Sequence, residues 1–202
     1  MKLRQLALLN LVFVLLFSTI AAYSLGETEQ TVIYQITHHT NAGELTSYTT
    51  YSIVAQEKAG YWLQRTTHMQ IDSKPLSITQ TLLESSTHKP LRYIMHRPAR
   101  MDRPAIVVDM PLEEMGKDEV LPTPITDAFA DAGRLQVQAG EFAVWQGQVG
   151  EFSLWANPDV PVLGVVKVET PEWTMELFRI EPSVTDLFPH KPPKGGRVFL
   201  EE

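Results

Sequence analysis

Histidine is the residue type in this sequence with the clearest capacity for chemistry, because an imidazole can bind a metal ion or transfer a proton near neutral pH. The chain has six histidines. His38 and His39 are adjacent, so on a strand they point to opposite faces and cannot both bind one ion without distortion. His68 could join one of them across a hairpin, but neither the H-x-x-E-H nor the H-E-x-x-H spacing of zinc enzymes occurs. The sequence therefore predicts solvent-facing histidines and no metal site.

The nucleophiles and carboxylates form no recognisable catalytic set either. The chain has no cysteine and no G-x-S-x-G motif. Its aspartates form no interpretable triad with the scattered serines, and the pair Glu113 and Glu114 lies in an acidic loop typical of solvated charge. We therefore expect a non-enzymatic protein without catalytic residues or cofactors. A metal-dependent or hydrolytic enzyme is the least favoured function for this chain.

A basic segment at residues 89–103 is the main electrostatic feature, with five lysines and arginines against one acid. Four of its arginines could contact lipid headgroups or an anionic partner: Arg92, Arg97, Arg100 and Arg103. The alternative is that they pair with the neighbouring acidic loop at residues 113–119. The net charge of the whole chain is −7, which argues against nucleic-acid binding because that function needs a basic surface.

The first residues indicate export. Lys2 and Arg4 precede an apolar run at residues 6–22, and small residues follow at the spacing that signal peptidase recognises. This pattern predicts a signal peptide at residues 1–24 and a mature protein in the periplasm or outside the cell. The alternative is a retained membrane anchor formed by residues 6–22. Without cysteine, an exported domain has no disulfides and depends on its hydrophobic core for stability.

The remaining pattern predicts an all-β domain at residues 29–182. β-branched and aromatic runs separated by short turns favour an antiparallel meander of nine or ten strands. The first five runs lie at residues 31–40, 45–56, 61–71, 76–83 and 91–95, and strand pattern resumes at residue 135. One short helix is expected at residues 123–131, with Thr123 as N-cap, Pro124 in the first turn and Gly133 as C-cap.

Residues 183–202 form a Pro- and Gly-rich tail that we expect to be extended or mobile. Val198, Phe199 and Leu200 are the point at which it could dock onto the domain.

One short helix cannot cover so wide a sheet, so the sheet must curl into a half-barrel or barrel, or leave a hydrophobic trough. Residues 139–181 supply one wall of that trough. The apolar residues that could contact a ligand there, or could simply form core, are Phe142, Val144, Phe152, Leu154, Trp173, Met175 and Leu177. Lys167 and Glu169 lie two residues apart on one strand, and with Glu176 they indicate the solvated face.

Two phrases resemble a known group of exported β-sheet proteins. The first is the hairpin S-T-H-K-P-L-R-Y at residues 86–93. The second combines A-G-E-F at residues 139–142, a strand containing Trp155, and V-P-V-L-G-V-V-K at residues 160–167. Both resemble the LolA/LolB-like superfamily. The resemblance implies a strongly curved antiparallel sheet with a hydrophobic interior that carries lipids or acylated proteins. Unlike the lipid-anchored members, this chain has no cysteine.

These observations lead us to expect a protein that binds a lipid or acyl chain in the concave face of its sheet. The alternative is a cell-envelope module that binds a protein partner through a sheet edge or through the basic segment.

Overall fold

A computed structural model describes residues 30–97, 99, 104–115, 120–122, 128–182, 184–188 and 190–199. The predicted signal peptide at residues 1–24 lies outside these residues, as do Arg100 and Arg103. The first six strands are β1 (Gln30–Thr40), β2 (Gly43–Glu57), β3 (Gly60–His68), β4 (Ser77–Glu84), β5 (Pro90–Arg97) and β6 (Ile106–Met110). The others are β7 (Ala130–Val137), β8 (Gly140–Val149), β9 (Phe152–Ala156), β10 (Val165–Glu169), β11 (Trp173–Pro182) and β12 (Arg197–Phe199).

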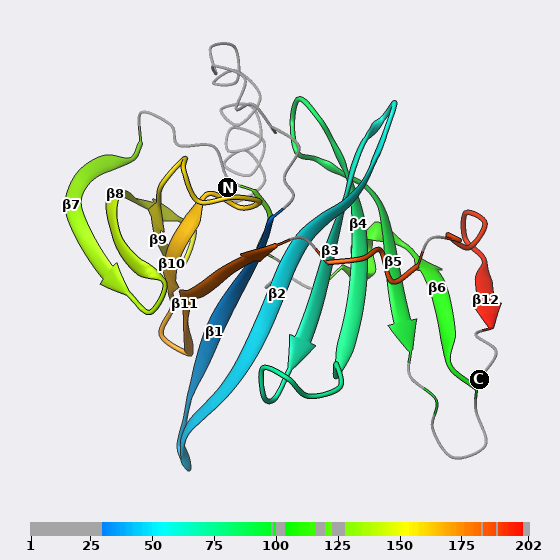
Figure 1. Cartoon of the computed structure of the whole chain (residues 1–202), viewed down its shortest axis with the longest axis horizontal. Helices are drawn as coiled ribbons and strands as arrows, with labels where there is room; N and C mark the ends of the chain where they lie inside the picture. The colour runs from blue at the N-terminus through cyan, green and yellow to red at the C-terminus, as the bar shows by residue number, and fades with distance from the viewer. Residues whose placement is uncertain are drawn as a thin grey trace, which may run out of the picture.

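All twelve strands belong to one antiparallel sheet with the order β12-β6-β5-β4-β3-β2-β1-β11-β10-β9-β8-β7. Within the described residues the sheet is open, with β7 and β12 at its edges. The prediction of an all-β, curved antiparallel sheet is confirmed. The expectation of one simple meander is wrong in detail, because two meanders, β1–β6 and β7–β11, are joined side by side where β1 pairs with β11 (Figure 1).

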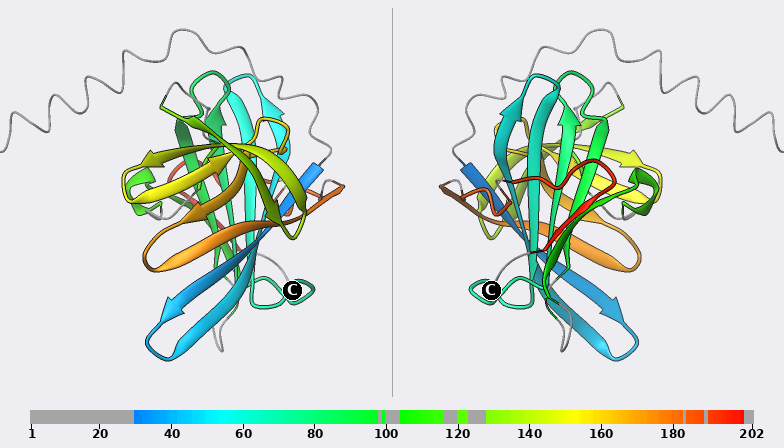
Figure 2. Two further views of the ribbon diagram at one scale, coloured as in Figure 1. Left: turned by 90° about the vertical axis from the view of Figure 1, so that its left-hand side faces the viewer. Right: turned by 90° about the vertical axis from the view of Figure 1, so that its right-hand side faces the viewer.

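The pairing of β1 with β11 brings together residues about 140 positions apart, from Gln30 opposite Pro182 to His38 opposite Trp173. A register shift between Ile33 and Tyr34 interrupts this ladder. Such irregularities bend a strand and increase its local twist. Figure 2 shows the result, in which β7–β9 run crosswise to β2–β5. The sheet thus folds over on itself and forms two facing halves.

The main hydrophobic core lies between these halves, against the inward face of the sheet. We call this inward side of the sheet the interior. Every second side chain of a strand points into this core, for example Val32 and Tyr34 of β1 and Met175 and Leu177 of β11. A sheet that folds over in this way buries its apolar face without any helix. That is the physical reason why so wide a sheet is stable here.

The opposite face of β3–β6 carries a second, smaller cluster, which the C-terminal residues cover. We call residues 184–188 and 190–199 the C-terminal strap. The strap leaves β11, crosses β3, β4 and β5, and ends in β12, which pairs with β6 (Figure 1). Its Phe188 packs with Trp62, Ile94 and other buried residues of these strands. The tail expected to be extended or mobile is therefore packed against the sheet over the described residues. Val198 and Phe199 lie in β12, whereas Leu200 lies outside the described residues.

The predicted helix at residues 123–131 does not fit the structure at its C-terminal end, because Ala130 and Asp131 begin strand β7. Residues 123–127 lie outside the described part of the chain. Gly133 has φ 75° and lies at an irregularity between Asp131 and Arg134 in the β7–β8 ladder, so the glycine expected to cap a helix accompanies a bulge instead. Elsewhere in the described residues the only helical segment is the single 3-10 turn Leu112–Glu114.

Candidate functional site

The predicted ligand wall lies in the interior, and the structure brings all seven of its residues to one cluster. Four of them are closed off from solvent within it, namely Val144, Leu154, Met175 and Leu177. The other three, Phe142, Phe152 and Trp173, are half-buried at its margin. The rings of Phe152 and Trp173 lie 5.9 Å apart in a tilted arrangement. The wall is therefore mainly core, and its aromatic margin is the part that a ligand could reach.

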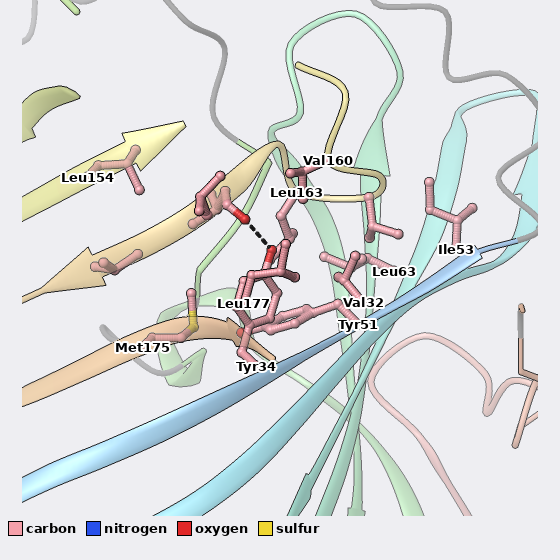
Figure 3. Close-up of a cluster of buried hydrophobic side chains, with 14 of the residues drawn as sticks. Val32, Tyr34, Tyr51, Ile53, Leu63, Leu154, Val160, Leu163, Met175 and Leu177 are labelled. Carbon is pink, nitrogen blue, oxygen red and sulfur yellow. Dashed lines mark hydrogen bonds between the residues drawn. The ribbon is translucent and has the colours of Figure 1, made fainter. Parts of the chain in front are cut away.

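A loop between β9 and β10, residues 157–164, fills part of the interior, and we call it the plug loop. Its Val160, Val162 and Leu163 are buried in the main cluster. Figure 3 shows Val160 and Leu163 among the side chains gathered around Tyr34. Asn157 anchors the loop, since its amide donates to the carbonyl of Ala143 at 2.6 Å and its Oδ1 accepts from the N–H of Asp159 at 2.6 Å.

Val162 of the plug loop has φ 67°, in the left-handed region. This conformation is a strained one for a β-branched residue, because Cβ crowds the following carbonyl. The burial of its side chain offsets that strain. Packing and the hydrogen bonds of Asn157 therefore hold the plug loop in place against the local backbone preference of Val162.

Tyr34 connects the two halves of the sheet. It is fully buried, and its hydroxyl donates to the carbonyl of Val165 at 2.8 Å (Figure 3). Its ring meets that of Tyr51 edge-on, with centroids 5.9 Å apart. Burial, with a smaller contribution from Tyr51, raises the pKa of Tyr34 well above its ordinary value, so this hydroxyl remains a donor.

Threonine hydroxyls extend the interior beyond the apolar cluster. Thr49 and Thr67 face each other across β2 and β3, and Thr79 lies on the same face of β4. Thr49 is 0% exposed and Thr79 is 5% exposed. The hydroxyl oxygen of each of the three threonines is buried and has no hydrogen-bond partner in the described structure. A buried hydroxyl left without a partner costs roughly 1–3 kcal/mol, so these groups are ready to bond a polar atom of a ligand or a water molecule.

The two arginines of the basic segment that the structure describes, Arg92 and Arg97, have different surroundings. Arg92 lies under the C-terminal strap, where its Nε is 3.1 Å from Oδ1 of Asp109 and its guanidinium donates to the carbonyl of Pro192. Arg97 is exposed, and its guanidinium contacts the sulfur of Met110 at 3.7 Å. The buried partner of Arg92 is thus Asp109 of β6 rather than the acidic loop at residues 113–119. Sequence reasoning did not find it because the register of β5 with β6 determines the pair.

Four of the described histidines lie in different surroundings and do not gather at one site. His39 bonds Oγ1 of Thr174 at 3.3 Å, and His68 bonds the carbonyl of Ser73 at 2.7 Å. His88 and His96 are partly buried, and burial lowers the pKa of each. In the part of the chain that the structure describes, no three His, Cys, Asp or Glu side chains gather in a way that could hold a metal ion.

A separate polar hollow of about 290 Å³ lies on the opposite face of the sheet, over β1, β10 and β11. Its floor includes Lys167 and Glu176, which alternation correctly assigned to one face. Gln35, Thr37 and Gln138 also line it, and sequence reasoning missed them. The only signal for Gln35 and Thr37 was the period-two pattern of β1, which gives the face of a residue but not the neighbouring strand. Gln138 lies in the turn between β7 and β8 and had no such signal.

No protein-family model matches this sequence, and no curated protein matches it as a relative. None of the helical segments described is long and apolar enough to span a membrane. The residues and their geometry are therefore the basis for a functional proposal.

Proposed function

We propose that this is an exported, non-enzymatic protein that binds a lipid or acyl chain in the interior of its folded sheet. The observation that carries the proposal is the row of buried hydroxyls on Thr49, Thr67 and Thr79 beside the apolar cluster. A lipid offers both partners at once, with hydrogen-bonding groups near its head and methylenes along its tail. The similarity of residues 86–93 and 139–167 to LolA/LolB-like proteins supports the same function.

The burial of an acyl chain could offset the cost of displacing part of the protein chain from the interior. Each methylene buried against apolar side chains contributes about 0.8 kcal/mol, so an eight-carbon segment would gain roughly 6 kcal/mol. The plug loop occupies this apolar space with three side chains and contains the strained Val162. We propose that the acyl chain enters between the half-buried aromatics at the margin and takes the place of the plug loop.

Isosteric substitution of two threonines tests this proposal. Val in place of Thr49 and Thr79 keeps the shape but removes the hydroxyls. We expect native mass spectrometry of the mature protein to show bound lipid, and T49V/T79V to retain about tenfold less of it. The variant should be equally or more stable to urea, because it no longer buries unsatisfied hydroxyls.

Thr50→Val is the matched control, since Thr50 lies on the other face of β2 and should leave lipid binding unchanged. Repeated recovery of lipid-free protein that also takes up no added lipid would contradict the proposal. That result would instead favour the envelope-module alternative, which the exposed edge strand β7 would serve by pairing with a strand of a partner.

A further inference from the structure

The polar hollow lies where the ladder between β10 and β11 ends at Lys167 and Glu176, and the turn between β7 and β8 lies next to β11 instead. The N–H of Ala139 in that turn donates to the carbonyl of Leu177 at 3.3 Å and so fixes the turn against the sheet. The neighbouring Gln138 then forms one wall of the hollow, opposite β1. The volume of about 290 Å³ is near the lower end of small-molecule sites, which begin at roughly 300 Å³.

The charged side chains at the hollow are already paired: Lys167 lies between two carboxylates, and Glu44 lies 3.5 Å from the imidazole of His39. Nζ of Lys167 lies 3.2 Å from a carboxylate oxygen of Glu176 and 3.2 Å from one of Glu169. Partial burial by itself lowers the pKa of Lys167, but its bonds to the two carboxylates outweigh this and raise the pKa overall. Lys167 therefore stays charged and bonded to Glu169 and Glu176. A charged ligand would have to break these pairs, so the hollow favours a neutral one.

Two side-chain amides lie beside these paired groups. Gln35 and Gln138 make no side-chain hydrogen bond within the described structure, and each amide can donate and accept. The hydroxyl of Thr37 adds a further donor and acceptor, whereas that of Thr174 already bonds His39 at 3.3 Å. The ring of Phe178, which the Arg179 guanidinium approaches to 5.3 Å, supplies one apolar surface. Neutral donors and acceptors beside a single aromatic ring are complementary to a sugar, which has hydroxyls at its edges and C–H groups on its faces.

We propose that the hollow binds a neutral polyhydroxylated ligand, namely a single saccharide unit, with Gln35 and Gln138 bonding its hydroxyls and Phe178 packing against its C–H face. This site lies on the opposite face of the sheet from the interior and does not depend on lipid binding. Its ligand would be either a free sugar or the exposed unit of a glycan.

The test uses the mature protein with two probes, a panel of neutral monosaccharides in saturation-transfer NMR and an array of neutral glycans. We expect binding to at least one probe, weakened about fivefold by Gln35→Ala and further by Q35A/T174V. Gln146→Ala is the matched control, because Gln146 is an exposed glutamine of β8 outside the hollow, and this variant should bind as the unsubstituted protein does.

Binding to the array but not to monosaccharides would identify a glycan unit as the ligand, and the reverse would identify a free sugar. Absence of binding to both probes would overturn the proposal. So would binding that Q35A/T174V leaves unchanged while circular dichroism shows the variant to be folded. A preference for sulfated or phosphorylated sugars over neutral ones would overturn the assignment of a neutral ligand.

Discussion

At the scale of single residues, burial determines which side chains keep their protons. Tyr61 and His88 form a pair in which the phenol oxygen lies 2.7 Å from Nδ1 of the imidazole. Burial raises the pKa of Tyr61 and lowers that of His88, so both groups are neutral, and the phenol donates to the imidazole. His88 also has φ 54°, a left-handed turn conformation that Asn tolerates well.

From the Tyr61–His88 pair we expect the folded protein to lose stability in mild acid. Because the folded pKa of His88 lies below its ordinary value of 6.5, the unfolded chain binds the proton first. The stabilising contribution of neutral His88 is therefore present above pH 6.5 and is lost as the pH falls through the folded pKa. We expect His88→Asn to make the free energy of unfolding less dependent on pH between about 7 and 5.

Urea titrations at several pH values measure this slope. Some slope should remain in the variant, because burial also lowers the pKa of His96, whose ring stacks on Phe188 at 5.6 Å. A slope identical to that of the unsubstituted protein would show that His88 does not titrate differently in the two states.

At the scale of elements, the C-terminal strap is attached through a row of buried polar side chains. Gln80 donates to Asp186 at 2.7 Å and to Gln64 at 2.8 Å, and Gln64 accepts from the N–H of Leu187 at 3.0 Å. Lys191 completes the row with a 2.7 Å bond to Asp186. These contacts position Phe188 over the second cluster.

Cations and a carboxylate surround Trp62 beneath the strap. The Lys191 ammonium lies 5.1 Å from the centre of its ring and the Arg92 guanidinium 5.7 Å from it. Its indole N–H donates to Glu57 at 2.5 Å. Trp62 is therefore the natural fluorescent reporter of whether the strap is attached.

Because Asp186 binds the strap to Gln80, we expect acid to weaken the attachment of the strap to the sheet. Partial burial by itself raises the pKa of Asp186, but the bonds from Lys191, Gln80 and the N–H of Phe188 outweigh this and lower it overall. Its contribution is present above its ordinary value of 3.8 and is lost as the pH falls through the folded pKa. Asp186→Asn should therefore weaken attachment at pH 7 by about 1–2 kcal/mol.

Tryptophan emission and limited proteolysis within residues 184–199 measure this attachment. We expect red-shifted emission and faster cleavage for Asp186→Asn, with the exposed Asp159→Asn as the matched control. Equal cleavage of both variants would mean that the ion pair contributes nothing to holding the strap.

At the scale of the whole molecule, the two halves share one core and should unfold together. The main cluster draws residues from β1, β2 and β3 as well as from β7 to β11, and Tyr34 bonds across it to Val165. Neither half keeps its side of the interior buried without the other. A single cooperative transition is the physical consequence.

Removing the Tyr34 hydroxyl tests this coupling. We expect Tyr34→Phe to lower the free energy of unfolding by about 1–2 kcal/mol, because the carbonyl of Val165 loses its buried donor. Tryptophan emission and far-ultraviolet circular dichroism should give coincident urea transitions. Tyr48→Phe, at a half-buried position of β2, is the control and should change little. Two separate transitions would show that the halves are independent folding units.

Local pattern by itself determined the strands, their hairpins and the faces of their residues. Two-residue alternation placed Lys167, Glu169 and Glu176 together, and it placed the seven residues of the predicted wall in one cluster. It failed at residues 130–131, where the capping pattern of an isolated helix was overridden by pairing with β8. Pairing with a neighbouring strand satisfies a whole row of backbone groups, whereas a cap satisfies only a few.

Only the tertiary structure decided which strands far apart in sequence meet. The pairing of β1 with β11 folds the sheet over, fills the interior with the plug loop and creates the polar hollow beside Lys167. The register of β5 with β6 brings Arg92 to Asp109, and the C-terminal strap partly covers this pair. The physical reason is that a strand's own sequence specifies its buried face, whereas its distant partner depends on packing summed over the whole sheet.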